Sequence, residues 1–198
     1  MCRFIETIQL KDGCFLNLPY HQERMNRTFI RFFDNSYSFD LQIFLHKQEC
    51  PLEGRHRCTL TYSKHERQLK IIEYKPKNIK RLRLKNCDDI DYSWKYADRT
   101  ELNNLLKDIP VDEELIIIKN DLITDTSYAN LVFYDGKDWF TPSRPLLQGT
   151  KREKLIEEGK IKEREIRVHD LKRFAKCSLI NAMLDIGEIE LPINRIFS

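Results

Sequence analysis

The chain has 198 residues, of which 41% are hydrophobic and 33% charged, and its formal net charge is +3. This composition is typical of a globular protein with one large domain or two small ones, and the interspersed charges exclude an extended nucleic-acid-binding surface. No apolar run approaches the length of a membrane span. The six cysteines lack CxxC spacing and the five histidines lack ligand-like pairing, which favours a cytoplasmic protein with reduced thiols and no metal centre.

The first half of the chain predicts a small α+β domain over residues 1–80. The Asp12-Gly13 pair is typical of a hairpin turn, and Met25 and Phe29 lie at helical spacing. The expected elements are strands 2–10 and 14–20, helices 21–33 and 39–47, and strands 56–63 and 68–76.

The second half predicts a larger domain over residues 81–198. Before it, the basic run Lys77–Lys85 alternates cations with apolar residues, which indicates a strand or crossover with one solvated face. No aromatic platform accompanies this run, so a nucleic-acid role is not expected. The remaining expected elements are a helix over 92–109, strands 115–118, 129–136 and 138–142, a helix over 149–158, a strand over 161–168, a helix over 169–175 and an apolar segment over 178–184.

Residues 112–152 carry most of the functional information. A buried strand is followed by an acid and hydroxyl cluster (Thr124 to Ser127), then by Asn130, a Thr-Pro pair and the segment LLQGTKR. In that segment Gly149 and Thr150 open a helix, and the unpaired amides of a first helical turn form the usual physical basis of a phosphate site. By itself this signal is weak, because many connections carry Gly-Thr only as a turn and cap.

The order of strand, acid cluster, Asn, Thr-Pro and LLxGxxR resembles the class IV aminotransferase family. This family contains pyridoxal 5'-phosphate (PLP) enzymes of the D-amino-acid and branched-chain aminotransferase fold, including 4-amino-4-deoxychorismate lyases. The resemblance implies a two-domain α+β fold (fold type IV) with a shortened N-terminal domain. It also implies a PLP cofactor, a small-molecule substrate and a homodimer, with neither nucleic acid nor membrane as a partner.

The resemblance assigns the PLP-bearing lysine to Lys95. The segment WKYADRTELNNLL is similar to the family segment in which this lysine precedes a helix. Lys95 would then hold the cofactor aldehyde as a Schiff base and shuttle the substrate proton. The alternative is that Lys95 is one of many lysines and happens to lie between two aromatic residues.

Asp125 occupies the position where the family usually has a glutamate facing the pyridine nitrogen. Aspartate is one methylene shorter, so it must lie closer to the ring or act through a water or a hydroxyl of Thr124 or Ser127. The hydrogen bond between a carboxylate and a protonated nitrogen is strong for an aspartate as well as for a glutamate. The alternative is a turn aspartate that caps backbone amides.

By the same resemblance, six residues stand at the family's phosphate-binding positions. Gly149 and Thr150 fit the phosphate turn, and Lys151 stands where the family often has a threonine. Arg24, three residues after His21 in an H-x-x-R pattern, fits the arginine that reaches the phosphate, although an exposed helix arginine is a common alternative. Asn181 and Ala182 fit a second turn on the phosphate side, or else belong to a buried core segment.

Strand residues of the first half are candidates for the substrate pocket. They are Glu6, Thr7, Arg57 and Tyr62, and strand residues with a polar outward face look the same in a sequence. Two departures concern this half: the turn that usually precedes the FET strand is reduced to MCR, and the small domain is short.

Three functions remain open. A 4-amino-4-deoxychorismate lyase, giving p-aminobenzoate and pyruvate, is favoured because the Asp98-Arg99 pair and the INAM segment look more like lyases. A branched-chain or D-amino-acid transaminase would use the same lysine but needs a site for two substrates. The third reading is a truncated relative without catalysis, motivated by the departures at Asp125 and Lys151.

Overall fold

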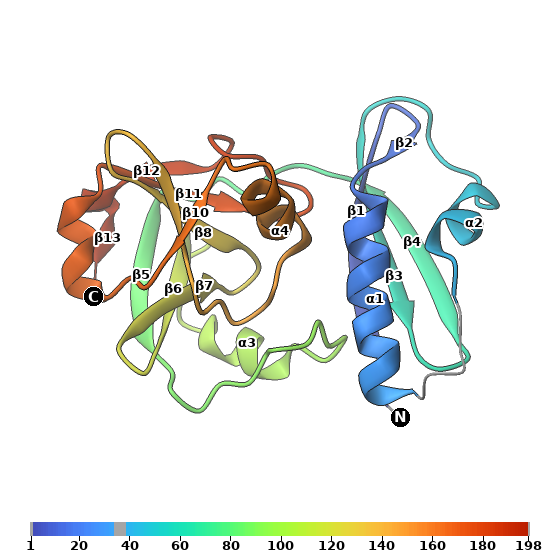
Figure 1. Ribbon diagram of the computed structural model, residues 1–198, viewed down its shortest axis with the longest axis horizontal. Helices are drawn as coiled ribbons and strands as arrows, with labels where there is room; N and C mark the ends of the chain where they lie inside the picture. Colours follow the sequence, from blue (N-terminus) through green and yellow to red (C-terminus); the bar gives the residue numbers. More distant parts are fainter. Residues whose placement is uncertain (1, 34–38, 198) are drawn as a thin grey trace. The chain divides into compact units, whose positions relative to one another are not determined.

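The computed structural model describes residues 2–33 and 39–197. The chain divides into two compact units, each drawn in Figure 1. The first consists of Met1–Lys75 with Trp94–Asp98, and the second of Pro76–Ser93 with Arg99–Ser198. The boundary expected at residue 80 is close to this division. The difference is the segment around Lys95, which was expected in the C-terminal domain and belongs to the first unit.

The first unit is a four-stranded antiparallel sheet with two helices. The sheet order is β2-β1-β3-β4, which matches the two hairpins expected from the sequence. Its elements are β1 (Phe4–Lys11), β2 (Cys14–Phe15), α1 (Leu18–Phe32), α2 (Leu41–His46), β3 (Arg55–Tyr62) and β4 (Arg67–Glu73).

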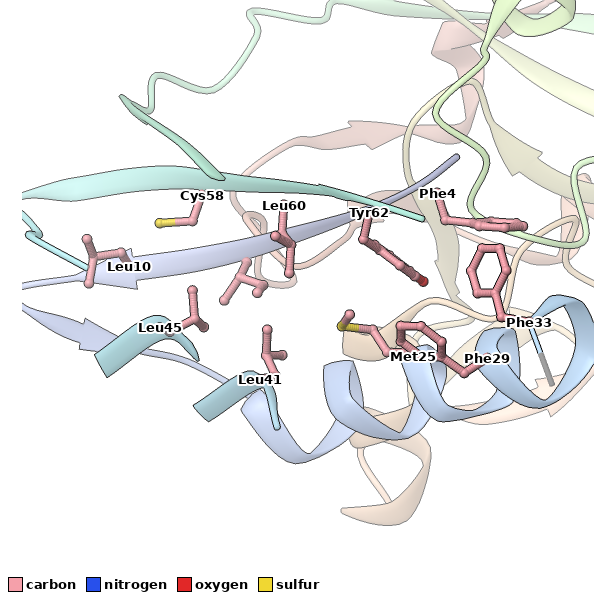
Figure 2. Close-up of a cluster of buried hydrophobic side chains, with 11 residues drawn as sticks. Phe4, Leu10, Met25, Phe29, Phe33, Leu41, Leu45, Cys58, Leu60 and Tyr62 are labelled. Atoms are coloured by element: carbon pink, nitrogen blue, oxygen red, sulfur yellow. The ribbon is translucent and has the colours of Figure 1, made fainter. Parts of the chain in front are cut away.

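One face of this sheet carries the hydrophobic core of the first unit. Alternation along β1 directs Phe4, Ile8 and Leu10 to one face, where α1 contributes Met25 and Phe29. Figure 2 shows Phe4, Leu10, Met25 and Phe29 of this core between the strands and the helices. The core therefore fixes the position of α1 against β1. It also fixes the positions of the polar side chains on the same face of α1.

The first helix begins earlier than the sequence pattern indicated. We expected a strand over 14–20, but β2 ends at Phe15 and α1 begins at Leu18. Asn17 adopts a left-handed conformation with φ 58°, which ends the strand, and Pro19 lies in the first helical turn. Proline is tolerated there because its missing N–H would be unpaired in any case.

The second unit is built on a nine-stranded mixed sheet. The path runs β10-β9-β8-β7-β6-β5-β13, and β11 joins it through β8 and carries β12. Its elements are β5 (Arg81–Asn86), α3 (Thr100–Leu105), β6 (Glu113–Lys119), β7 (Leu122–Thr126), β8 (Asn130–Tyr134), β9 (Trp139–Pro142), α4 (Thr150–Glu157), β10 (Lys162–Arg164), the 3-10 helix η1 (Val168–Arg173), β11 (Lys176–Ile180), β12 (Glu190–Pro192), the 3-10 helix η2 (Ile193–Arg195) and β13 (Ile196–Phe197).

Strand β8 is the branch point of this sheet, because it pairs with β7, β9 and β11. The register between β7 and β8 pairs Asp125 with Asn130. Strand β6 is buried along nearly its whole length, as expected for a strand covered on both faces. The acid and the asparagine singled out in the sequence therefore lie side by side at the junction of the sheet.

Several predicted elements of the second half were wrong in extent or type. The helix expected over 92–109 is limited to α3, and the strand β7, which contains most of the acid and hydroxyl cluster, was not predicted. The helix expected over 169–175 is the 3-10 helix η1, and β12 and β13 were not predicted. The expected strand in the basic run is confirmed as β5.

The described residues contain neither a membrane-spanning helix nor a metal-binding group of side chains. No helix in that part of the chain is both long and apolar enough to cross a membrane. The same residues contain no group of three His, Cys, Asp or Glu side chains arranged to hold a metal ion.

We expect Phe29→Ala to destabilise the protein by about 3–5 kcal/mol, because Phe29 is a buried aromatic whose removal leaves a cavity. The matched control is Ile30→Ala on the same helix, since Ile30 is 61% exposed and its loss should change stability by about 0.5 kcal/mol or less. Urea unfolding followed by circular dichroism measures both. Equal losses would contradict the assignment of this helix face to the core.

Candidate active site

Lys95 lies in a short extended segment that pairs with β1. The Ile5 amide donates to the Lys95 carbonyl at 2.9 Å, and the Ala97 amide donates to the Arg3 carbonyl at 2.9 Å. The aromatic neighbours of the lysine anchor this segment: Tyr96 stacks on Phe4, with ring centroids 5.2 Å apart, and Trp94 packs against Phe32. The two aromatic residues that flank Lys95 therefore fix its backbone in the first unit.

A buried polar cluster lies in the same unit. The Glu6 carboxylate accepts from Arg24 Nε at 2.9 Å and from Arg24 Nη2 at 2.5 Å, and it is bonded to His21 Nδ1 at 2.6 Å. Glu6 comes from β1, whereas His21 and Arg24 come from α1, three residues apart on one face. All three side chains are buried. The predicted phosphate-binding arginine is thus held by a carboxylate of its own unit.

The protonation states in this cluster follow from burial and charge. Burial raises the pKa of Glu6, but Arg24 and His21 outweigh it and hold that pKa at about 2. Burial lowers the pKa of His21 below 6.5, with the charges of Arg24 and Lys95 acting in the same direction against Glu6. At neutral pH the cluster therefore holds an ionised Glu6 beside a neutral imidazole, and Lys95 is near enough to affect that imidazole.

The remaining residues predicted for the substrate pocket divide between the two faces of the sheet. The register sets Thr7 opposite Thr59 and Gln9 opposite Arg57, so Thr7 and Arg57 share the face away from α1. Tyr62 lies on the other face, is 1% exposed and packs in the core. Tyr62 therefore lies on the opposite face of the sheet from Thr7 and Arg57.

In the second unit, Asp125 is bonded to the segment that leads into α4. Its Oδ1 accepts from Asn130 Nδ2 at 2.8 Å and its Oδ2 accepts from the Leu147 amide at 2.9 Å. Asn130 Nδ2 also donates to the Leu147 carbonyl at 2.9 Å. These three bonds tie the β7–β8 junction to the connection between β9 and α4.

Burial raises the pKa of Asp125 from 3.8 to about 6, against the lowering effects of the Leu147 amide, Asn130 and Arg152. The carboxylate is therefore mainly ionised at neutral pH. A carboxylate offers about four acceptor positions, and the amides of Leu146 and Leu147 with Asn130 use three of them. A carboxylate can accept more than one bond at each oxygen, so a further donor could also bond to Asp125.

The hydroxyls beside Asp125 are engaged with the backbone. Thr124 Oγ1 donates to the Ile117 carbonyl at 2.7 Å, and Thr126 Oγ1 donates to the Ala129 carbonyl at 3.0 Å. The carbonyl of Ser127 accepts from Arg99 Nη2 at 2.5 Å. Thr124 therefore donates its hydroxyl proton to the backbone, and Asp125 accepts from backbone amides, which is also the arrangement of the turn alternative.

Helix α4 begins at a glycine that leaves no room for a side chain. Gly149 is the N-cap and makes no side-chain cap bond, and the first helical bond runs from the Glu153 amide to the Gly149 carbonyl at 2.9 Å. A Cβ at Gly149 would lie 1.9 Å from Asn130 Oδ1. The first turn thus presents amides without intrahelical partners, next to the buried Thr150.

The second predicted turn is tied to the first through Lys151. This side chain is 7% exposed and forms an ion pair with Asp185, which directly follows the turn at Asn181–Leu184. Asn181 Oδ1 accepts from the Met183 amide at 2.8 Å, and its Nδ2 donates to the Tyr128 carbonyl at 3.3 Å. Asp125, Asn130, Gly149, Thr150, Lys151, Asn181 and Ala182 therefore belong to one unit, and the lysine that replaces a threonine links its two turns.

Sequence reasoning gave no role to Asp185 and only a weak one to Glu6. The signal for Glu6 was present: it shares a strand face with Phe4, Ile8 and Leu10, so it is a charge on an otherwise apolar face. Such a charge needs a buried partner of opposite sign. Asp185 had no comparable signal, because it pairs with Lys151 only through the tertiary fold.

The chain is similar to known proteins over most of its length. The model of the family described as amino-transferase class IV matches residues 93–191. An uncharacterised protein from Haemophilus influenzae is 38% identical over 92% of this chain and 98% of its own length. The chain belongs to the class IV aminotransferase family. This is a PLP-dependent family.

Two solved structures are similar to this chain over most of its length. A protein from Haemophilus somnus 129PT, provisionally named a 4-amino-4-deoxychorismate lyase, is 38% identical over 92% of this chain and 97% of its own, with a TM-score of 0.86. A hypothetical aminotransferase from Mycobacterium tuberculosis in a PLP-bound form is 16% identical, covers 98% of this chain and 81% of its own, and has a TM-score of 0.73. The second likeness shows the shared fold.

We expect Gly149→Ala to destabilise the protein by about 1–3 kcal/mol, because the added Cβ overlaps the Asn130 side chain and forces it away from Asp125. Thermal unfolding measures the loss. In an Asn130→Ala background, where the overlapping atom is absent, the same substitution should cost much less. Additive losses would show that the overlap with Asn130 is not the cause.

Asp125 should make the stability of the protein depend on pH. Its pKa is raised in the folded protein, so its favourable contribution is complete below about pH 4 and is lost as the pH rises through about 6. Relative to Asp125→Asn, which cannot titrate, the wild type should lose up to about 3 kcal/mol between pH 4 and 7. Unfolding free energies of both proteins across this range provide the measurement. Parallel pH profiles would contradict the raised pKa.

Proposed function

We propose that this protein is a PLP-dependent lyase that converts 4-amino-4-deoxychorismate to p-aminobenzoate and pyruvate. The observation that carries the proposal is the 38% identity, over 92% of the chain, to the Haemophilus somnus protein provisionally named as such a lyase. The family likeness also supports a cytoplasmic homodimer acting on a small molecule, as expected from the sequence.

The residues present fit PLP. The uncapped amides at the start of α4 suit a phosphate, and the bare Gly149 lets that phosphate approach the backbone. The carboxylate of Asp125 is mainly ionised at neutral pH and can accept a further bond from a protonated ring nitrogen. Arg24 supplies a guanidinium and Lys95 an amine.

In this proposal each residue has one task. Bound PLP supplies a ring that withdraws electrons from the substrate carbon next to the amine. Lys95 would hold the cofactor covalently and then carry the substrate proton on Nζ. Asp125 would keep the ring nitrogen protonated by accepting a hydrogen bond from it. The amides of Thr150 and Lys151 would hold the phosphate together with Arg24, so that the ring stays oriented while bonds break.

Two other functions use the same residues. The first alternative is an amino-acid transaminase of the branched-chain or D-amino-acid type, which also fits the family description; Lys95 would move the proton between two carbons, and a keto acid would follow as second substrate. A relative that binds PLP without turnover would keep the same cofactor contacts. The three functions differ in what leaves the protein, so product analysis separates them.

The proposal predicts that PLP becomes attached to Lys95. The purified protein should show a visible absorbance band with added PLP, and borohydride should fix the cofactor on the peptide that contains Lys95, as identified by mass spectrometry. Lys95→Ala should abolish the fixed label. The matched control is Lys64→Ala, which removes another half-buried lysine of the same unit and should leave the label intact.

Assays of the labelled protein then distinguish the reactions. A lyase releases pyruvate and p-aminobenzoate in equal amounts from 4-amino-4-deoxychorismate without a keto acid. Keto-acid-dependent amino transfer without that release would favour the transaminase. Labelling without either activity would favour the non-catalytic relative, and a wild type that takes no label at Lys95 would overturn the PLP proposal itself.

A further inference from the structure

Arg99 is a half-buried cation of the second unit that has no anion beside it. It belongs to the Asp98-Arg99 pair that the sequence analysis singled out. With the residues that the structure describes, its side chain forms one hydrogen bond, from Nη2 to the Ser127 carbonyl at 2.5 Å. Its Nε is enclosed and has no partner among the same residues. Partial burial removes water from the guanidinium, and a carbonyl does not supply the negative charge that would offset this loss.

The other buried or half-buried arginines of the second unit each have a partner for their charge. The partners are Glu113 for Arg83, Glu163 for Arg152, Asp121 for Arg167, and the rings of Phe140 and Phe174 for Arg164. Among the described arginines of this unit, Arg99 is the half-buried one with neither an ion pair nor a ring contact. Its surroundings therefore leave a positive charge to be matched by something else.

The bond to Ser127 orients the guanidinium but uses a small part of it. An arginine side chain has five N–H groups, of which one is bonded to Ser127 and one, on Nε, is enclosed. The remaining three belong to Nη1 and Nη2, and two parallel N–H groups of a guanidinium match the two oxygens of a carboxylate. Ser127 follows Asp125 by two residues at the end of β7, so this donor pair is tied to the turn next to that acid.

We propose that Arg99 binds a carboxylate of the substrate, which gives the second unit a carboxylate-binding site at the turn between β7 and β8. This inference rests on the proposed function. Both products of that reaction, p-aminobenzoate and pyruvate, are carboxylates, so the substrate presents two such groups. The guanidinium recognises the chemistry that the two groups share, and the two products can be tested separately.

A purely structural role for Arg99 makes a different prediction. Arg99 directly precedes α3 and Ser127 directly follows β7, so their bond also ties the helix to the turn. Loss of this tie alone would weaken the binding of charged and neutral ligands to a similar extent. Loss of a carboxylate site weakens only the ligands that carry a carboxylate. The neutral amides p-aminobenzamide and pyruvamide, which resemble the two products in shape, therefore separate the roles.

The test compares Arg99→Met with wild type after PLP has been fixed by borohydride, so that the cofactor cannot react with the probes. We expect Arg99→Met to bind p-aminobenzoate or pyruvate about tenfold more weakly, as for the loss of a charge-assisted contact. Binding of the corresponding amide should change less than about twofold. The acid that loses affinity identifies the carboxylate that Arg99 binds. NMR titration of each probe gives the affinities.

The matched control is Arg164→Met, which removes another half-buried guanidinium of the same unit and should leave the affinities of both acids unchanged. Should Arg99→Met fail to fold, Arg99→Lys carries the same comparison. Lysine keeps the charge but lacks the paired N–H groups, so the acid should bind about threefold more weakly while its amide binds as before.

The outcomes separate this inference from the proposed function. Equal losses for acid and amide, or no loss for either acid, would overturn the carboxylate site, while release of both products by the wild type would keep the lyase. Binding of an acid that depends on Arg99, without release of products from the substrate, would overturn the lyase and keep the site. A wild type that takes no label at Lys95, or that binds neither acid, would overturn both.

Discussion

The second unit depends on the ring of hydrogen bonds between Asp125, Asn130 and Leu147. Asn130 donates both of its side-chain amide protons, one to Asp125 and one to the Leu147 carbonyl. The Leu147 backbone amide in turn donates to Asp125. This ring fixes the connection that leads into α4, and a side chain at Gly149 would break it. Asp125, Asn130 and Gly149 therefore depend on one another structurally. The start of α4 is positioned by the Asp125 carboxylate and not by a side-chain cap.

Both units bury charge, although burial of charge is costly. In the first unit Glu6 offsets that cost by pairing with Arg24 and His21, and its pKa falls to about 2. In the second unit Asp125 has amides and Asn130 as partners, and no cation of the described residues forms an ion pair with it; its pKa rises to about 6. The opposite shifts follow from the opposite surroundings. An acid without a contacting cation is suited to accept a protonated ligand nitrogen, whereas a paired acid is suited to hold a protein side chain.

The two departures from the family pattern have physical counterparts in the structure. Aspartate at position 125 is short enough to bond the Leu147 amide and Asn130 together, within the sheet junction. Lys151 directs its amine to Asp185 and joins the two turns that the family uses on the phosphate side. A threonine side chain is shorter and carries no charge, so it could not form this ion pair with Asp185. Both substitutions therefore make contacts of their own and are not simple losses.

Local pattern in the sequence was enough to predict α1, the two hairpins of the first unit, the buried strand β6 and the helix that starts after Gly149. It also singled out Asp125, Asn130 and Gly149, because each lies in one continuous block whose order is specific. The extended segment at Lys95 could not be predicted in this way. Its backbone partners are Ile5 and Arg3, some ninety residues earlier, so a helical pattern was overridden by pairing with β1.

The sequence by itself determined the family, the cofactor class and the identity of the polar residues, since these depend on residue types at short spacings. Only the tertiary structure decided which of them meet. It paired Glu6 with Arg24 and His21, moved Tyr62 into the core and joined Lys151 to Asp185. The physical reason is that a buried charge pairs with a residue of whichever element packs against it. Packing between elements that are distant in the sequence produces no periodic pattern of residues from which it could be predicted.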